Sequence, residues 1–536
     1  MLRRAERALR RSAVPSLSRF EKTMPVNWIA LTVFVICFAG VTILGFASAN
    51  WRKGDLDLIH EWGLGGGTFG TLITWFLIGG DIYTAYTFIA IPALAFGAGA
   101  IAFFAVPYTT LIYPITFVVF PRMWSVCRRH GYITAADFVR GRFGNRWLAL
   151  AVAVTGLVAT MPYIALQLVG LEVVIAGLGL PTTGVLSELP LLIAFVILAA
   201  FTYTSGLRAP ASIAVVKDVM VYIVIFAAIG VVIYRFGGFG PIFEAVPAAK
   251  LVLATPPAGS TGAYTTYATL AFGSAAALFM YPHALTAILS SSTRDVIRRN
   301  SALLPAYSLV LAFLTLLGFM AIKMGVGSNP LYTDLFKRYS NTFAVPALFL
   351  DIFPSWFAGF AFAAIGIGAL VPAAIMSIAA ANLWTRNIHL EFINPRATPQ
   401  QEAKMAKLVS LVVKLGALYF VVGLEKDFVI TLQLLGGVWI IQTLPAVLIG
   451  LYTRWFNSWA LLVGWAVGMG FGTYAVAQTG FKNATYTLSI FGTQVPAFAA
   501  VYALIANIAV AVVLTLVFNM AARPERRDAT VAADYV

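Results

Sequence analysis

Apolar runs of about 20 residues recur along the whole chain and are separated by short polar or charged segments. A run of this length crosses a bilayer as an α-helix. Because the runs are continuous and do not alternate between lipid-facing and lumen-facing residues, they fit helices rather than a membrane β-barrel. The pattern predicts an all-α integral membrane protein with thirteen transmembrane helices, at residues 26–49, 70–94, 99–121, 146–179, 189–204, 210–235, 265–290, 301–325, 356–385, 405–424, 428–453, 456–479 and 497–521.

The composition supports a membrane protein. Hydrophobic residues make up 60% of the chain, charged residues make up 11%, and the mean hydropathy is +0.87, whereas soluble domains are about 45–50% apolar. The net charge of +15 would suggest nucleic-acid binding in a soluble protein, but here the cations lie between the apolar runs, as in membrane-protein loops. We therefore expect the lipid bilayer and no nucleic acid as a partner, and the sequence does not identify protein partners.

The distribution of Lys and Arg predicts the orientation. With the N-terminus outside, the inside loops and tail hold 21 of these cations and the outside loops hold 7, while seven cations in residues 1–24 favour the opposite arrangement. Because positively charged loops stay inside, we expect the N-terminus outside and the C-terminus in the cytoplasm. The predicted parts are a cationic segment at 1–24, one transmembrane domain at 25–521 and a short cytoplasmic tail at 522–536.

Two of the predicted spans are interrupted. The second reads "GGD" at 79–81 and continues to Pro92, and the seventh reads "GSA" at 273–275 and continues to Pro282. Each glycine costs about 1 kcal/mol in a helix relative to alanine, and an aspartate near the middle of a span costs about 3 kcal/mol more. In transporters, such breaks free backbone carbonyls for a cation and recur at matching positions in two halves of the fold. The offset of five spans predicts a 5+5 inverted repeat of spans 2–6 and 7–11, and the alternative is a chance occurrence of Gly and Pro.

Four segments of the chain resemble the signature segments of the sodium:solute symporter family. They are "GYITAADFVRGRFGNR" (131–146), "YTSGLRAPASIAVVKD" (203–218), "YPHALTAIL" (281–289) and "PAAIMSIAAANLWTRN" (372–387). The resemblance covers nearly the whole chain and implies the family's thirteen-span inverted-repeat fold, which is of the leucine-transporter type. Within the family, "GGDIYTAYTFIAIPALAFGAGA" and "ATMPYIALQLVG" look most similar to bacterial monocarboxylate permeases, which carry lactate, pyruvate, acetate, propionate and sometimes alanine. This resemblance implies a multi-pass protein of the bacterial cytoplasmic membrane.

The resemblance also implies a sodium ion between the second and ninth spans, held by backbone carbonyls and two adjacent hydroxyls. The second hydroxyl position holds Ile378 here, and a hard cation prefers oxygen ligands. A proton is therefore the alternative coupling ion. By position, the implied ion-binding residues are Gly79, Ile82 and Ala374 through their carbonyls, Ser377 through its hydroxyl, and Asp81 beside them.

The sixth span departs further from the family pattern. Ala214 takes a position where many relatives have Asp, and Lys217 takes a position where they have Gln. An ammonium within the membrane can substitute for a bound cation, bind a carboxylate or carry a proton. We therefore predict that Lys217 is the ion-coupling group. The alternative is that Lys217, next to Asp218, lies near the cytoplasmic end of its helix and extends to water.

A small carboxylate needs hydrogen-bond donors in a tight cavity near the middle of the membrane. The helix N-terminus that follows the break in the second span favours an anion. Polar side chains on neighbouring spans add donors, although for each of them alone a helix–helix hydrogen bond is the alternative role. The predicted substrate-binding residues are Thr84, Tyr86, Thr87, Tyr163, Gln167, Ser274, Tyr281, Gln433 and Gln442.

Two further features are expected to have structural roles. The segment "YITAADFVRGRFG" (132–144) predicts a short helix beneath the bundle, with Thr134 as its N-cap and Asp137 near its start. His283 follows Pro282, and we expect it to support the helix break rather than carry a proton.

These features predict a secondary transporter that imports short monocarboxylates by alternating access, with Na⁺ or H⁺ as the coupling ion and no organic cofactor. An enzyme is not expected, because the sequence has no P-loop, dinucleotide fingerprint or metal-ligand cluster. The alternatives are a symporter for small neutral amino acids such as alanine, and an uncoupled facilitator.

Overall fold

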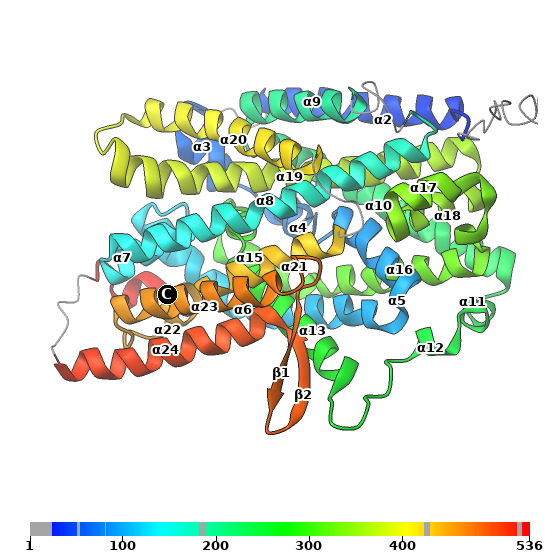
Figure 1. Cartoon of the computed structure of the whole chain (residues 1–536). Helices are drawn as coiled ribbons and strands as arrows, with labels where there is room; N and C mark the ends of the chain where they lie inside the picture. The colour runs from blue at the N-terminus through cyan, green and yellow to red at the C-terminus, as the bar shows by residue number, and fades with distance from the viewer. Residues whose placement is uncertain (1–23, 51–53, 81, 182–188, 423–428, 522–527) are drawn as a thin grey trace, which may run out of the picture.

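The computed structural model describes residues 24–50, 54–80, 82–181, 189–422, 429–521 and 528–536. Within these ranges the chain forms long apolar helices that lie alongside one another (Figure 1). Nine helices in the described residues are long and apolar enough to cross a membrane, or ten if one bent pair counts as a span. The prediction of a helical membrane protein is therefore confirmed. Asp81 and nearly all of the predicted segment 1–24 lie outside the described residues.

The helices follow the predicted apolar runs. The long helices are α2 (Trp28–Ala47), α6 (Ala105–His130), α8 (Arg146–Gly177), α10 (Arg208–Phe236), α16 (Pro305–Met324), α19 (Ser355–Trp384), α20 (Pro399–Val422), α23 (Ser458–Ala477) and α24 (Ala499–Ala521). Shorter ones are α9 (Leu189–Ser205) and α21 (Val429–Ile440), the latter continuing through two irregular turns to α22 (Gly450–Tyr452). Connecting helices are α3 (Ile59–Leu64), α7 (Ala135–Phe143), α11 (Gly240–Ala245), α12 (Ala248–Leu251), α15 (Arg294–Leu303), α17 (Thr333–Tyr339) and α18 (Ala344–Ile352).

Both predicted interruptions are present. One run divides into α4 (Thr71–Gly80) and α5 (Ile91–Ala98), joined through the π-turn η3 (Tyr86–Ala90). The other divides into α13 (Gly262–Met280) and α14 (Pro282–Leu289), which are bent by 54°. The small residues 273–275 do not interrupt α13, so that part of the prediction was wrong. The break lies at Tyr281, whose backbone is extended, because proline disfavours the helical conformation in the residue before it.

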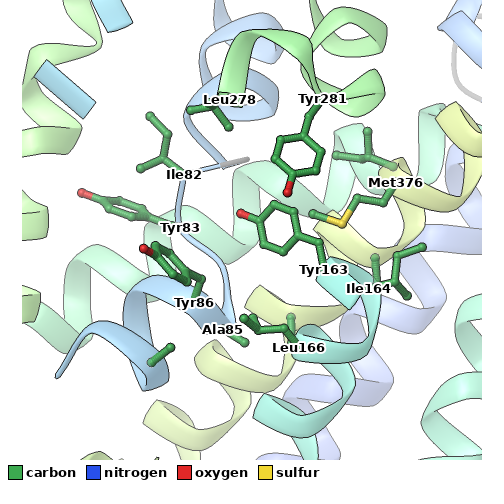
Figure 2. Close-up of a cluster of buried hydrophobic side chains, with 14 of the residues drawn as sticks. Ile82, Tyr83, Ala85, Tyr86, Tyr163, Ile164, Leu166, Leu278, Tyr281 and Met376 are labelled. Atoms are coloured by element: carbon green, nitrogen blue, oxygen red, sulfur yellow. The ribbon is translucent and has the colours of Figure 1, made fainter. Parts of the chain in front are cut away.

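Helix α19 forms the centre of the bundle, and its apolar segment is buried. It packs against α2, α8, α10 and α20, and its many alanines and glycines allow neighbouring backbones to come close. A Cβ at Gly359 would lie 2.2 Å from the carbonyl oxygen of Ala30 in α2. Figure 2 shows Met376 of α19 beside Tyr163 of α8. Helix α19 thus places two of the predicted ion-binding residues, Ala374 and Ser377, at the centre of the bundle.

A β-hairpin between α23 and α24 was not predicted. Strands β1 (Thr485–Ile490) and β2 (Thr493–Phe498) pair antiparallel and project from the bundle (Figure 1). The hairpin binds the beginning of α13, where Thr261 N donates to Gln494 O at 3.0 Å and Thr265 Oγ1 donates to Pro496 O at 2.7 Å. The expectation of helices and loops alone was therefore wrong for this segment.

Helix α7 begins as predicted. The Thr134 hydroxyl accepts a hydrogen bond from Asp137 N at 2.9 Å, which caps the helix. Asn387 Nδ2 donates to the Asp137 carboxylate at 2.8 Å and so ties α7 to the end of α19, through the π-turn η9 (Thr385–Ile393).

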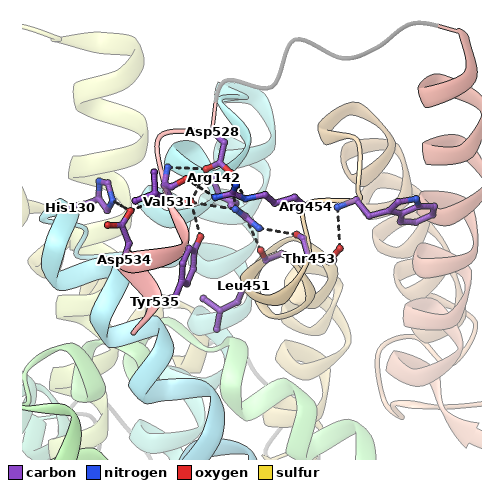
Figure 3. A network of polar contacts seen from close by, with 12 residues as sticks. His130, Arg142, Leu451, Thr453, Arg454, Asp528, Val531, Asp534 and Tyr535 are labelled. Carbon is purple, nitrogen blue, oxygen red and sulfur yellow. Dashed lines mark hydrogen bonds and ion pairs between the residues drawn. The ribbon is translucent and has the colours of Figure 1, made fainter.

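The described part of the C-terminal tail folds back onto the bundle rather than extending from it (Figure 3). Arg142 of α7 is buried and binds the Asp528 carboxylate at 2.7 Å and the Gly450 carbonyl at 3.0 Å. At the end of the tail, Asp534 contacts His130 at 2.8 Å. The Val531 N–H and then His130 lower the pKa of Asp534 to about 2. These contacts are therefore fully formed above the ordinary carboxyl pKa, and they are lost only as the pH falls towards about 2.

Replacing Arg142 with Ala is expected to lower the thermal unfolding midpoint of the purified protein by several degrees. The change removes a buried guanidinium that donates to the partly exposed Asp528 carboxylate and to the Gly450 carbonyl, and hydrogen bonds to charged groups contribute about 1.5–3 kcal/mol each. Scanning fluorimetry in detergent measures the midpoint. Lys337→Ala is the control, because it removes an ion pair with Asp334 whose lysine side chain is 72% exposed, and such pairs contribute about 0–1 kcal/mol. Equal shifts for the two variants would contradict the prediction.

Candidate functional site

Backbone carbonyls at the break between α4 and α5 have hydrogen-bond partners within the protein. The Gly79 carbonyl accepts hydrogen bonds from Ile82 N at 2.9 Å and Tyr83 N at 3.4 Å, so it closes a turn. The carbonyls of Gly80 and Tyr83 instead accept hydrogen bonds from Lys217 Nζ, at 2.7 and 2.9 Å. In this conformation the open backbone at the break therefore binds the ammonium of Lys217.

Lys217 lies in α10 and is completely buried, so it does not extend to water. Its Nζ also contacts the carboxylate of Asp218, at 2.9 Å, and Tyr307 of α16 donates to the other oxygen of that carboxylate at 2.8 Å. The ammonium thus has two carbonyl acceptors and an ion-pair contact with Asp218, whose Oδ1 accepts no hydrogen bond in the described residues. A buried charge of this kind is held by its counter-charge as well as by hydrogen bonds.

The remaining predicted ion-binding residues lie in the centre of α19, which packs against both α4 and α10. Ser377 Oγ donates to the Ala374 carbonyl at 2.8 Å, and it accepts a hydrogen bond from Ser410 of α20 at 3.3 Å. Ala374, Ser377 and Ile378 are all buried. The second and ninth predicted spans therefore bring their polar groups to adjacent helices.

Three predicted substrate residues cap the helix that follows the break. Thr87 Oγ1 accepts from Thr84 N at 3.0 Å, Gln167 Oε1 accepts from Ala85 N at 3.0 Å, and Thr84 Oγ1 accepts from Tyr86 N at 3.1 Å. These side chains satisfy the first N–H groups of the restarted helix, which would otherwise be free at a helix start. The N-terminus that was expected to attract an anion is thus capped by the protein in this conformation.

A cluster of aromatic residues lies next to the break (Figure 2). Tyr163 of α8 and Tyr281 point toward one another with ring centroids 5.4 Å apart, and the Tyr281 hydroxyl donates to the Gln433 carbonyl at 3.1 Å. His283 packs against the Tyr281 ring at 5.2 Å, which fits its expected structural role. Buried side-chain atoms that lack a hydrogen-bond partner in the described part of the chain include Tyr86 Oη, Ser274 Oγ and Gln433 Oε1.

Gln442 has its contacts elsewhere. Its amide nitrogen donates to Val438 O at 3.0 Å, and its side-chain oxygen accepts from Asn507 of α24 at 3.2 Å. A Cβ at Gly468 of α23 would lie 2.2 Å from that oxygen. The observed contacts of Gln442 thus connect it to α23 and α24, as in the alternative role of a helix–helix hydrogen bond.

Comparison with known proteins identifies the chain. The model of the sodium:solute symporter family matches residues 62–468. The chain belongs to this family. The symporter is 51% identical over 494 residues to a monocarboxylate transport permease protein of Rhizobium johnstonii, a match that covers 92% of this chain and 97% of that protein. It is 32% identical over 451 residues to the uncharacterized symporter YodF of Bacillus subtilis, covering 83% and 87% of the two chains.

The fold of the symporter is similar to that of a Na⁺-coupled sialic acid symporter solved in a substrate-bound, outward-open state. The TM-score is 0.72 at 16% sequence identity, and the match covers 91% of this chain and 98% of that one. Family membership confirms a membrane transporter of a small solute, with a coupling ion such as Na⁺, rather than an enzyme.

Sequence reasoning missed four residues of the symporter's polar network: Tyr307, Asp218, Ser410 and Lys414. Asp218 appeared only as a neighbour of Lys217, although a carboxylate next to a membrane lysine is a usable signal for an ion pair. Lys414 is a lysine within the tenth apolar run and could have been identified on the same ground. Tyr307 and Ser410 carried no such signal, because tyrosine and serine are ordinary residues in membrane helices.

Alanine at positions 79 and 80 is expected to have unequal effects. A Cβ at Gly79 would lie 2.2 Å from Cζ of the Tyr307 ring, whereas a Cβ at Gly80 would lie 3.0 Å from Lys217 Nζ, at the end of a flexible side chain. Gly79→Ala should therefore lower the yield of monodisperse protein and the thermal midpoint more than Gly80→Ala does, since overpacking costs about 1–3 kcal/mol. Size-exclusion chromatography and scanning fluorimetry measure both. A larger loss in Gly80→Ala would show that the Tyr307 contact is not the constraint at this break.

Proposed function

We propose that the symporter imports short monocarboxylates such as lactate, pyruvate, acetate or propionate by alternating access, coupled to Na⁺ or H⁺. The observation that carries this proposal is the 51% identity, over nearly the full length of both chains, to a protein named a monocarboxylate transport permease. The buried Tyr86 hydroxyl and the Ser274 hydroxyl without partners support it, since unsatisfied buried groups are suited to bind a small polar ligand.

We also propose that the chain has thirteen spans in a 5+5 inverted repeat, within one transmembrane domain at 25–521 of a protein of the bacterial cytoplasmic membrane. The interrupted second and seventh spans support the repeat. The short α9 and the charged α20 support a number of spans above nine. Gly99 supports it as well, because its φ of 75° ends α5 and separates it from α6. The loop charges favour a cytoplasmic C-terminus, with the tail at 522–536 on that side.

For ion coupling, we propose that the Lys217 ammonium takes the place of a bound cation at the break. Its bonds to the Gly80 and Tyr83 carbonyls support this role. The sodium site that the family resemblance implies, at Gly79, Asp81, Ile82, Ala374 and Ser377, is the other candidate for the coupling ion. In either case, ion and substrate must raise each other's affinity by the same factor.

For substrate binding, we propose the side chains around the aromatic cluster: Tyr86, Tyr163, Ser274, Tyr281 and Gln433. They come from separate elements that meet beside the break, and several carry hydroxyl donors suited to a carboxylate. Thr84, Thr87 and Gln167 would take part by holding the start of the restarted helix in place through their hydrogen bonds to its N–H groups. They would bind an anion directly only if these hydrogen bonds were broken.

The proposed function is tested by uptake of labelled lactate and pyruvate into proteoliposomes, with sodium and proton gradients imposed separately. We expect accumulation that depends on at least one gradient. Uptake without accumulation and without dependence on either gradient would establish the facilitator instead. A thermal-shift panel of monocarboxylates against neutral amino acids separates the alternative substrate class, because a ligand that binds the folded state raises its midpoint.

Removing the Lys217 charge is expected to reduce uptake by about 100-fold, since it leaves the Asp218 carboxylate buried and unpaired at a cost of about 3 kcal/mol. Lys217→Met is the test, and Lys217→Met combined with Asp218→Asn is the control, because removing both charges relieves that cost. The double variant should recover thermal stability but not accumulation. Full accumulation in Lys217→Met would refute the role of the lysine at the break.

The predicted sodium site has its own test in Ser377→Ala. If the coupling ion is sodium bound at this site, the substitution should raise the sodium concentration for half-maximal uptake by about tenfold or more, because one oxygen ligand is lost. An unchanged sodium dependence would contradict a role of Ser377 as a sodium ligand.

A further inference from the structure

A second buried lysine lies on the other side of α19. Lys414 of α20 is only 2% exposed, and its Nζ donates to Ser410 Oγ at 2.7 Å. Among the described residues, Ser410 is its one polar partner, and no carboxylate lies within ion-pair distance. Lys217, by contrast, has two carbonyls and a carboxylate. Two lysines at membrane depth thus have opposite environments.

The difference decides which lysine can release a proton. Deprotonating Lys217 would weaken its two charge-assisted hydrogen bonds to carbonyls and leave Asp218 as an unpaired buried charge. Deprotonating Lys414 breaks no ion pair, because Ser410 can reverse its role and donate to the neutral amine. Lys414 is therefore the group that can exist in two protonation states without disrupting its surroundings.

Lys414 is connected to the predicted ion site by hydrogen bonds. Ser410 donates to Ser377 Oγ at 3.3 Å, and Ser377 donates to the Ala374 carbonyl at 2.8 Å. When Lys414 is an ammonium, it occupies an acceptor site of Ser410, and Ser410 in turn occupies one of Ser377. When Lys414 is neutral, Ser410 donates to the amine and releases the Ser377 oxygen. Met376, the neighbour of Ser377 in α19, lies beside Tyr163 of the aromatic cluster (Figure 2).

A groove with a mostly apolar lining runs past Lys414. The groove lies between α9 and α20 and has a volume of about 520 Å³. Lys407, Ser410 and Lys414 line it at the spacing of one helix face. At the Lys407 end, that side chain pairs with Asp57 at 3.0 Å, and the Asp57 side chain is 71% exposed. The polar edge of the groove thus leads from the exposed Asp57 carboxylate, past Lys407 and Ser410, to the buried ammonium, and this edge is the path by which a proton would reach water.

We propose that Lys414 is a second, exchangeable proton-binding site of the symporter, and that Ser410 and Ser377 transmit its protonation to the predicted ion site. The inference rests on the proposed function for its link to substrate, but not for the exchange of the proton itself. In the exchange step one proton leaves Nζ for water in the groove, and the resulting amine accepts the hydrogen bond of Ser410. The groove leads to the loop that follows α2, which the loop charges place on the cytoplasmic side.

Other charged and titratable groups on α20 and on the elements packed against it have their own partners or lie on other surfaces. Lys407 pairs with Asp57 and lies over the ring of Tyr203 of α9. Helix α19 carries no titratable side chain between Ser355 and Trp384. On α20 itself the remaining groups are Lys404 and Tyr419, which are exposed, and Glu402, which pairs with Arg386 of η9. On the elements packed against α20 they are Glu391 of η9, paired with Arg140; His389 of η9; Glu172 of α8, paired with Arg338; Arg146 and Tyr163 of α8; and Glu61 of α3, paired with Arg208, with His60 beside it.

Two variants test the proposal, with a third as control. Lys414→Met removes the exchangeable proton, and Lys414→Arg keeps a positive charge that is not released, because guanidinium stays protonated in proteins. Lys404→Met removes an exposed lysine from the same helix. Pyruvate affinity of detergent-solubilised protein is measured by calorimetry between about pH 5 and pH 9, a range in which a buried lysine can titrate.

We expect the pyruvate affinity of the wild type and of Lys404→Met to change by about tenfold or more across this range, and that of both Lys414 variants by less than about twofold. Lys414→Arg keeps the test valid if Lys414→Met fails to fold. A pH dependence that persists in a folded Lys414 variant would overturn the link between Lys414 and the substrate.

A second measurement needs no substrate. Potentiometric titration over the same pH range should show that wild-type protein releases about one proton per chain more than either Lys414 variant does. Equal proton release would overturn the exchange itself. If the wild type binds no monocarboxylate yet shows the extra proton, the proposed function fails while the proton site stands.

Discussion

The ammonium of Lys217 is the interaction on which the interrupted second span depends. A helix that opens within a bilayer leaves carbonyls that water does not reach, and each unsatisfied group costs several kcal/mol. Lys217 satisfies the carbonyls of Gly80 and Tyr83, and Asp218 balances the charge that it brings. The open segment is therefore stable only with α10 packed against it.

The same interaction organises the neighbouring helices. Asp218 accepts a hydrogen bond from the Tyr307 hydroxyl, and the Tyr83 hydroxyl donates to the Tyr307 carbonyl at 3.2 Å. The break, α10 and α16 thus form a closed set of polar contacts, and the Tyr307 ring fills the space above Gly79. Glycine at position 79 serves this packing as much as it serves backbone freedom, which explains why a weak helix former occurs in an otherwise apolar span.

Sequence reasoning recovered the features that follow from chain length, local chemistry and proline. The apolar runs, the Thr134 cap and the Pro282 break arise from interactions within a few residues of one another. It did not give the features that contacts between distant residues decide. The contacts of Gln442 with α24, and the use of Thr84 and Gln167 as caps, depend on which helices become neighbours.

The same limit applies to the two membrane lysines and to the hairpin. The sequence of an apolar run does not distinguish a lysine with two carbonyl acceptors and a carboxylate, such as Lys217, from one with a single hydroxyl partner in the described residues, such as Lys414. Strands β1 and β2 are short, and their register is tied to α13, more than 200 residues earlier in the chain. Single-chain patterning carries no information on such pairings.

The hairpin has a mechanical consequence. Its strands join the end of α23 to the start of α24, and its hydrogen bonds hold the first turns of α13, including one from Phe498 N to Thr269 Oγ1 at 2.9 Å. The beginning of this broken helix is therefore tied by hydrogen bonds to the segment that connects the last two helices. A displacement of the first turns of α13 would break these hydrogen bonds unless the hairpin and the helices attached to it moved as well.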